Sequence, residues 1–342
     1  MSSANNQYPN VSICVPVYNV ELYIERCLIS IMSQTYNGKM ECIIVDDCGT
    51  DKSLAIAEQL ITNYQGSIAF HIIHHDHNRG LAAARNTAVE AAKGEFIIHI
   101  DSDDWIEPNM VEELVKKQME TNADIVSCNA IAHYTDREEQ LTEPDYSSKD
   151  EMMRSILLLT LDHVIWRRLI RASLYRDNHI SAVEGVNIGE DHYTLPRLLF
   201  YANSFASCEK LLYHYNCMNV NSYIQSAEHA FSPKRVSSDV ASLNILIDFF
   251  EKNEQVYLDE LYETKLRYIY SNFFVMLKLG RKDLYKALSS DWQSIPVHYK
   301  KANGLNKLRC KFLSPSFYTL NRCRVFGRIS IKKLFRVRCY NL

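Results

Sequence analysis

The first 130 residues alternate between short apolar runs and longer segments in which apolar positions recur every three or four residues. The apolar runs are typical of strands buried on both faces, and they lie at 11–19, 42–45, 68–73, 96–100 and 124–128. The intervening spacing predicts helices over 21–35, 52–64, 80–92 and 109–121. Strands and helices that alternate in this way form a largely parallel sheet with helical crossovers, so the pattern predicts an α/β fold.

Polar residues follow three of these apolar runs. Tyr18-Asn19, Asp46-Asp47 and the acidic turn 101–104 each come where a predicted strand ends. Parallel strands bring their carboxyl ends to one edge of a sheet, where open α/β folds bind their ligands. The sequence therefore predicts a polar site at this edge.

The pattern changes beyond residue 130. Residues 135–150 are polar and predict a loop, whereas 151–161, 192–202 and the aromatic-rich stretch 235–290 have helical spacing. We expect one domain over 1–225 that divides into two parts at about residue 130. A helical region over 226–299 and a tail over 300–342 follow it.

Charge separates this tail from the rest of the chain. Residues 300–342 hold 12 Lys or Arg and no Asp or Glu, which leaves 26 basic and 41 acidic residues elsewhere although the net charge is only −3. Basic and apolar residues alternate in the tail, as in segments that lie on anionic membrane surfaces. The alternative is a solvated helix packed on the acidic body. No motif indicates nucleic-acid binding.

Composition excludes several other classes of site. The ten glycines form neither GxGxxG nor GxxxxGK[ST], and the ten cysteines contain no CxxC pair. His74, His75 and His77 do not have the spacing of a tetrahedral zinc site. The first residues do not read as a secretion signal and no apolar stretch is long enough to span a bilayer, so we expect a cytoplasmic protein.

The acidic turn Asp101-Ser102-Asp103-Asp104 is a candidate metal site. Three carboxylates within four residues repel one another unless a cation neutralises them. Oxygen ligands favour hard cations, so Mg²⁺ or Mn²⁺ is expected. The alternative is a solvated acidic loop that caps the next helix.

Several blocks in register resemble one large family, the family 2 inverting nucleotide-sugar glycosyltransferases of GT-A fold. The similarity covers about residues 10–225, and the blocks are VSICVPVYN, SQT followed by IIVDDCGTDKS, NRGLAAARNTAVEAAKGEFIIHIDSDD, IWRRLI and GEDHYTLPRLL. The resemblance implies a GT-A-type, Rossmann-like, mixed and mostly parallel sheet flanked by helices, with a helical C-terminal appendage. It also implies transfer of a sugar from a nucleotide diphosphate, most often UDP, to an acceptor hydroxyl with inversion. By this resemblance, about 10–130 is the nucleotide half of the domain and about 131–225 is its acceptor half.

The resemblance also assigns roles to residues. Asp191 is the implied catalytic base, and Asp101, Asp103 and Asp104 are the implied metal ligands. Asp46 or Asp47 is expected to hydrogen-bond the base, and Asp47 is favoured for a uracil N–H. The implied nucleotide-sugar site comprises Pro16, Tyr18, Asn19, Asp46, Asp47, Arg79, Arg85, Asp101, Ser102, Asp103 and Glu190.

Some roles stay open at this point. Arg79, Arg85 and Asn86 contact donor phosphate or position the acidic turn, or the arginines pair with acids such as Asp46 or Asp76. His214 is a further metal ligand or a plain strand histidine, and Asn216 stands where the family has Arg. Without the resemblance, Glu190 and Asp191 are interpreted as acidic residues that stabilise a helix N-terminus.

The implied biology is synthesis of cell-surface polysaccharide or glycolipid. The acceptor is then a glycan or a lipid-linked sugar, and the basic tail would hold the protein at the inner face of the cell membrane. Two other functions compete with this one: a sugar-phosphate nucleotidyltransferase, and a catalytically inactive module that binds nucleotide sugars. The opening segment VPVYNVE has neither the glycines nor the basic residues of a nucleotidyltransferase loop.

Overall fold

The computed structural model describes residues 8–301 except 145, 147, 162, 220–221 and 223–232. The chain forms two compact units. The first unit comprises residues up to 156 together with 162–225, and the second comprises 157–161 together with the residues from 226 onward. The basic tail lies outside the described residues from 302 onward.

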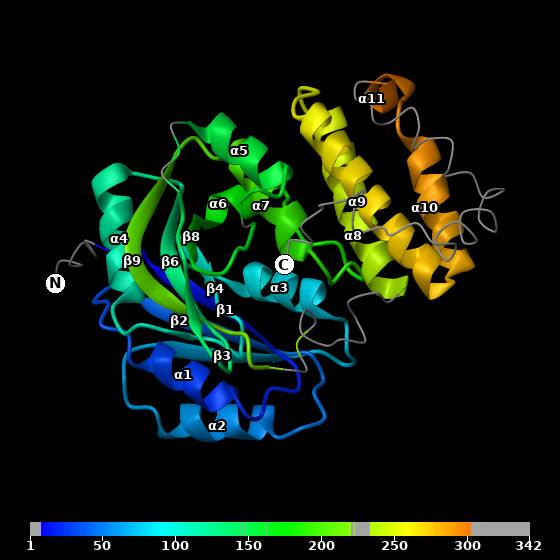
Figure 1. Cartoon of the computed structure of the whole chain (residues 1–342). Helices are drawn as coiled ribbons and strands as arrows, with labels where there is room; N and C mark the ends of the chain where they lie inside the picture. Colours follow the sequence, from blue (N-terminus) through cyan, green and yellow to red (C-terminus); the bar gives the residue numbers. More distant parts are fainter. Residues whose placement is uncertain are drawn as a thin grey trace. The chain divides into compact units, whose positions relative to one another are not determined.

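The first unit is built on a nine-stranded sheet in which β7 pairs only with β6 and the other strands follow the order β3-β2-β1-β4-β8-β6-β9-β5 (Figure 1). Neighbouring strands among the first four in sequence, which are β1 (Val11–Val17), β2 (Met40–Asp46), β3 (Ala69–His74) and β4 (Phe96–His99), pair in parallel. The others are β5 (Trp105–Ile106), β6 (Ile125–His133), β7 (Glu138–Leu141), β8 (Arg168–Arg171) and β9 (Phe205–Asn216). Because β8 runs antiparallel to both β4 and β6, the sheet is mixed, as predicted.

Right-handed crossovers decide which helices cover each face of this sheet. From β1 to β3 the chain moves in one direction, which places α1 (Ile24–Met32) and α2 (Ser53–Asn63) on one face. From β3 to β4 it moves back, so α3 (Leu81–Ala91) covers the other face (Figure 1). The remaining helices of this part are α4 (Met110–Thr121), α5 (Lys149–Leu157), α6 (Ala172–Arg176) and α7 (Glu190–Tyr201).

The core lies between α1 and the centre of the sheet. Every residue of β1 is buried, as the uninterrupted apolar run predicts. Ile24, Leu28 and Ile31 of α1 pack into the same cluster from the face that their helical spacing creates. The predicted loop at 135–150 is wrong in part, because it contains β7 and the first residues of α5. The residues of β7 are mostly exposed and polar, so they lack the apolar alternation from which a strand is predicted.

The second unit consists of α8 (Pro233–Lys252), α9 (Leu258–Leu279), α10 (Lys282–Ser294) and α11 (Val297–Lys301). Its helices bury apolar side chains such as Phe250, Leu261 and Ile269. Gly280 ends α9 in the left-handed conformation, with φ +71°, and the amide of Arg281 then reaches back to the carbonyl of Met276. Among the described residues, no helix is both long enough and apolar enough to cross a bilayer.

Candidate active site at the carboxyl ends of the strands

The site begins where the pairing of β1 with β4 ends, at the point where the strand order reverses. The last residue of β1 that pairs with β4 is Cys14, whose carbonyl accepts the amide of Ile100. Pro16 lies two residues further on, so its missing N–H falls where β4 no longer offers a partner. The pairing of the two strands therefore ends before Pro16, at the position where sheets of this kind bind ligands.

Two loops are tied together on the β2 side of this position. Asn19 has a left-handed backbone, with φ +52°, and its Oδ1 accepts the amide of Thr50 at 2.7 Å. The amide of Glu21 donates to Asp51 Oδ2 at 2.8 Å. The turn after β1 is therefore fixed by the loop after β2, and Tyr18 remains 45% exposed at its rim.

Asp47 holds the start of α3 in place. Its Oδ1 accepts the amide of Arg79 at 2.8 Å and faces His75 Nδ1 at 2.7 Å, and its Oδ2 accepts the amide of Gly80 at 2.7 Å. Gly80 has φ +89°, a conformation that favours glycine. Asp46 contacts the ring of His74 instead, so the two adjacent carboxylates have different surroundings.

The acidic turn after β4 is positioned by the end of β9. The hydroxyl of Tyr213 donates to Asp104 Oδ2 at 2.7 Å, and the amide of Asn216 donates to Asp104 Oδ1 at 2.7 Å. Asp104 is fully buried, so both its carboxylate oxygens serve to hold the turn. Asn219 donates its side-chain N–H to Asp103 Oδ2 at 2.8 Å. Ser102 is buried within the same turn.

Burial and mutual repulsion perturb the carboxyl groups of this turn. Burial and the nearby charge of Asp101 raise the pKa of Asp103 to about 6, although the hydrogen bond from Asn219 opposes the shift. Burial, followed by the charge of Asp103, also raises the pKa of Asp104 well above its ordinary value. The turn is therefore a place where negative charge is crowded and a cation would be stabilised.

Arg85 of α3 joins this turn to the start of α7. Its Nη2 lies 2.9 Å from Asp101 Oδ1, 3.4 Å from Glu190 Oε1 and 3.7 Å from Asp191 Oδ1. The side chain of Arg85 is only 4% exposed, so little water screens these contacts. One guanidinium thus gathers carboxylates from two segments that lie about ninety residues apart in the sequence.

The beginning of α7 sets the position of Glu190 and Asp191. Gly189 adopts φ +76° just before the helix, and both acids occupy its first turn, where the helix dipole favours negative charge. The Tyr193 hydroxyl accepts the amide of Val183 at 3.0 Å, which fixes the preceding loop. Burial, and then the charge of Asp191, raise the pKa of Glu190 to about 8.

The donor set of the acidic turn fits a hard divalent cation. Asp101 and Asp103 carry oxygen ligands, and the crowding that raises the pKa of Asp103 is relieved by positive charge. No cluster of three or more His, Cys, Asp or Glu side chains in the described part of the chain forms a ready-made metal cage. Mg²⁺ commonly binds through one or two carboxylates and completes its shell with substrate phosphates, so two protein carboxylates suit it.

The remaining candidates have other surroundings. Arg79 pairs with Glu184 and not with Asp46 or Asp76. Of Arg79 and Arg85, only Arg85 contacts the acidic turn. Both ring nitrogens of His214 are engaged, by Glu107 at 2.8 Å and by His133 at 2.9 Å.

Sequence reasoning missed the parts that Tyr213 and Asn219 play around the acidic turn. It also missed the bonds from Asp47 to the backbone of the loop before α3. The available signal for the role of Tyr213 was its position three residues before Asn216, which stands where the family has Arg.

Comparison with known proteins finds several glycosyltransferases that are similar to this chain. The profile of glycosyl transferase family 2 matches residues 12–178. The putative glycosyltransferase EpsH of Bacillus subtilis is 32% identical over 258 residues, which are 72% of this chain and 71% of EpsH. The TarS poly(ribitol-phosphate) β-N-acetylglucosaminyltransferase of Staphylococcus aureus is 26% identical over 63% of this chain and 37% of TarS.

Solved structures share the architecture. A crystal structure of S. aureus TarS residues 1–349 with UDP-GlcNAc matches 94% of this chain and 93% of that one, with a TM-score of 0.71 and 21% identity. A mannosyltransferase from Pyrobaculum calidifontis, in complex with GDP-Man and Mn²⁺, matches 96% of this chain and 88% of its own, with a TM-score of 0.53 and 16% identity. The fold is therefore that of the GT-A glycosyltransferases, and the chain belongs to glycosyl transferase family 2.

Proposed function

We propose that this protein is a metal-dependent, inverting glycosyltransferase that uses a UDP-sugar. The observation that carries the proposal is the contact of Arg85 with Asp101, Glu190 and Asp191. That contact gives the carboxylate of the acidic turn and the carboxylate assigned as base a shared partner. A transferase needs these two functions side by side, because the leaving group and the attacking hydroxyl meet at one sugar carbon.

The donor nucleotide is assigned to the edge of the sheet at Pro16, Tyr18 and Asn19, with Asp47 toward the base. A carboxylate offers about four acceptor positions, and three donors already fix Asp47. The remaining position suits one imide N–H of uracil, and the three bonds hold the carboxylate rigid for it. The matched TarS structures with UDP-GlcNAc and with UDP support this choice of nucleotide.

Asp101 and Asp103 are the proposed ligands of Mg²⁺ or Mn²⁺. The bound cation would stabilise the negative charge that develops on the departing diphosphate. Asn219 orients Asp103 for this role, and Asp104 is proposed to act through its bonds to β9, which keep the turn in shape. The Mn²⁺ named with the Pyrobaculum mannosyltransferase supports a divalent ion.

Asp191 is the proposed base. Burial, and then the charge of Asp191, raise the pKa of the neighbouring Glu190 to about 8. Asp191 then accepts the proton from the acceptor hydroxyl as the oxygen attacks the sugar from the side opposite the diphosphate, and the configuration inverts. Arg85 holds both acidic segments in register through its contacts with Asp101 and Asp191.

The acceptor is proposed to be a glycan or a lipid-linked sugar of a cell-surface polymer. The name of TarS, a poly(ribitol-phosphate) transferase, supports a polymeric acceptor. The basic tail remains a prediction for anionic membrane binding. Removal of residues 301–342 should release the protein from anionic vesicles at low salt, and unchanged sedimentation with the vesicles would contradict it.

Asp191→Asn tests the proposed reaction. We expect UDP release in the presence of Mn²⁺ and acceptor to fall by about 10²–10⁴-fold, with unchanged stabilisation by the UDP-sugar in a thermal-shift assay. Asp177→Asn, which alters an exposed carboxylate of the same unit, is the matched control and should keep full activity. Turnover close to that of the unmodified protein would remove Asp191 from its role. A chain that binds donor without any turnover would support the inactive module instead.

A further inference from the structure

The segment that leads into α7 is attached to α3 at a second point besides Arg85. The amide of Ala82 donates to the side-chain Oδ1 of Asn187 at 3.1 Å. Ala82 and Arg85 are three residues apart, so they share one face of α3. Asn187 and Glu190 are also three residues apart, and Arg85 contacts Glu190. Residues 187–191 therefore meet this face of α3 at two points with matching spacing.

The start of α3 depends on acceptors from elsewhere in the chain. Gly80 stands at its N-cap and has no side chain to accept the first amides of the helix. Asp47 accepts the amides of Arg79 and Gly80, and Asn187 accepts that of Ala82. The acid assigned to the nucleobase and the residue just before the proposed base thus bind amides within four consecutive residues.

Asn187 fits closely against this helix start. The residue is only 8% exposed. A Cβ at residue 80 would lie 2.2 Å from Asn187 Nδ2, so the close approach requires Gly80. The side chain therefore has little room to move, which fixes its bond to Ala82 in place.

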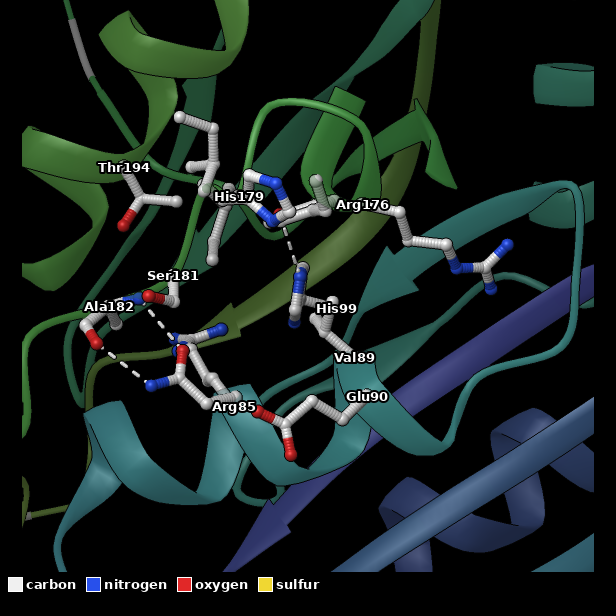
Figure 2. Close-up of a pocket in the computed structure, with 13 residues that line it drawn as sticks. Arg85, Val89, Glu90, His99, Arg176, His179, Ser181, Ala182 and Thr194 are labelled. Atoms are coloured by element: carbon white, nitrogen blue, oxygen red, sulfur yellow. Dashed lines mark hydrogen bonds between the residues drawn. The ribbon is translucent and has the colours of Figure 1, made fainter. Parts of the chain in front are cut away.

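Asn86, whose role the sequence left open, holds the same segment further upstream. Its Nδ2 donates to the carbonyl of Ala182 and its Oδ1 accepts the Ala182 amide, both at 2.8 Å (Figure 2). The next amide, of Val183, donates to the Tyr193 hydroxyl at 3.0 Å. Replacement of Asn187 should therefore shift the chain next to α7 without releasing the whole segment.

The contact of Arg85 with Asp191 does not by itself set the direction of the carboxylate. The distance from Nη2 to Oδ1 is 3.7 Å, which is too long for a hydrogen bond and leaves an electrostatic attraction with little directional preference. The bond from Ala82 to Asn187 is directional and lies four residues before Asp191. A second attachment of this kind restricts rotation of the segment about Arg85.

We propose that Asn187 is a positioning residue of the transfer reaction, which aims the Asp191 carboxylate at the acceptor hydroxyl by holding the start of α7 against α3. This inference rests on the proposed function, in which Asp191 is the base. Displacement of a reacting group by about 1 Å costs on the order of 10²-fold in rate. Asp47 keeps its own bonds to α3, so donor binding should survive the loss of Asn187.

The test is UDP release from UDP-GlcNAc, UDP-glucose and UDP-galactose by the full chain, with Mn²⁺ and with water as the acceptor. Asn187→Ala should lower kcat by about 10- to 100-fold and leave KM for the UDP-sugar nearly unchanged. Asn187→Asp keeps an acceptor oxygen for the Ala82 amide and should recover most of kcat. If Asn187→Ala fails to fold, Asn187→Ser replaces it, because its shorter side chain does not reach this amide.

A double variant separates positioning from a general loss of structure. In the Asp191→Asn background, Asn187→Ala should reduce the residual turnover no further, because both substitutions act through one carboxylate. A merely structural role would reduce turnover by the same factor in both backgrounds.

Ser148→Ala is the matched control. The Ser148 hydroxyl accepts the amide of Glu151 at 3.2 Å at the start of α5, in the same unit, so this variant also loses a side-chain bond to a helix amide. Its kcat should equal that of the unmodified protein.

Unchanged kcat in Asn187→Ala, or a further loss in the Asp191→Asn background, overturns the proposal. Failure of the proposed function has a different signature: the unmodified protein turns over none of the three sugars, or Asp191→Asn retains full turnover. The inference about Asn187 then falls with it.

Discussion

Replacement of Arg85 by methionine should destabilise the first unit strongly. Methionine has a similar length and fills the space, but it leaves the carboxylates that lie within 3.7 Å of the guanidinium without their cation. Removing one member of a buried charge pair costs about 3–5 kcal/mol. Asp101 is 24% exposed, so water screens part of its charge and the lower end, about 3 kcal/mol, is expected.

The assay is thermal unfolding of the full chain at pH 7.5 in EDTA. For a unit of this size, about 3 kcal/mol lowers Tm by roughly 6–12 °C. Arg85→Lys keeps the positive charge but loses the planar guanidinium, so its Tm should lie between that of the unmodified protein and that of Arg85→Met. Arg137→Met, which removes an exposed arginine paired with Asp136, should change stability by at most about 1 kcal/mol.

The response of each variant to Mn²⁺ tests whether the guanidinium of Arg85 acts on the acidic turn. Loss of the guanidinium raises the negative potential at Asp101, so the cation should bind the methionine variant more tightly and raise its Tm more than that of the unmodified protein. The reasoning is refuted if Arg85→Met unfolds within 2 °C of the parent (about 1 kcal/mol or less). It is also refuted if Mn²⁺ stabilises both proteins equally.

Three further outcomes follow from the same site. Asn219→Ala should weaken Mn²⁺ binding by about tenfold, measured by calorimetry, because Asp103 loses the bond that orients it. The pKa of Asp103 is raised from 3.8 to about 6, so Mn²⁺ affinity should fall by up to about tenfold per pH unit below pH 6. The folded state binds the proton on Asp103 more tightly than the unfolded chain does, so the metal-free protein should become more stable as pH falls from 6 toward 4. If neither Mn²⁺ affinity nor stability changes with pH in this range, the raised pKa of Asp103 is contradicted. Gly80→Ala should cost roughly 1–3 kcal/mol in chemical denaturation, since a Cβ would lie 2.2 Å from Asn187 Nδ2, whereas Gly185→Ala, at φ +85° in open space, should cost less.

The local pattern of the chain determined the elements near the site. The apolar runs at β1, β2 and β4 and the helical spacing between them depend on neighbours within a few residues, so periodicity reveals them. The polar residues at the ends of these strands could be placed at one edge, because parallel crossovers leave that edge little freedom. Motif order then pointed to Asp191, which lies far away in the sequence.

Only the tertiary structure decided which acids share a partner. Arg85 could have paired with any nearby carboxylate, and its choice of Asp101, Glu190 and Asp191 depends on how α3 packs beside α7. The roles of Asp104 and Asp47 as internal anchors likewise depend on β9 and on the loop before α3. Charge pairing is long-range and nearly blind to sequence distance, whereas periodicity is local. The sequence therefore determined the strands and their acidic ends, and folding decided which of those acids accept backbone amides and which share the guanidinium of Arg85.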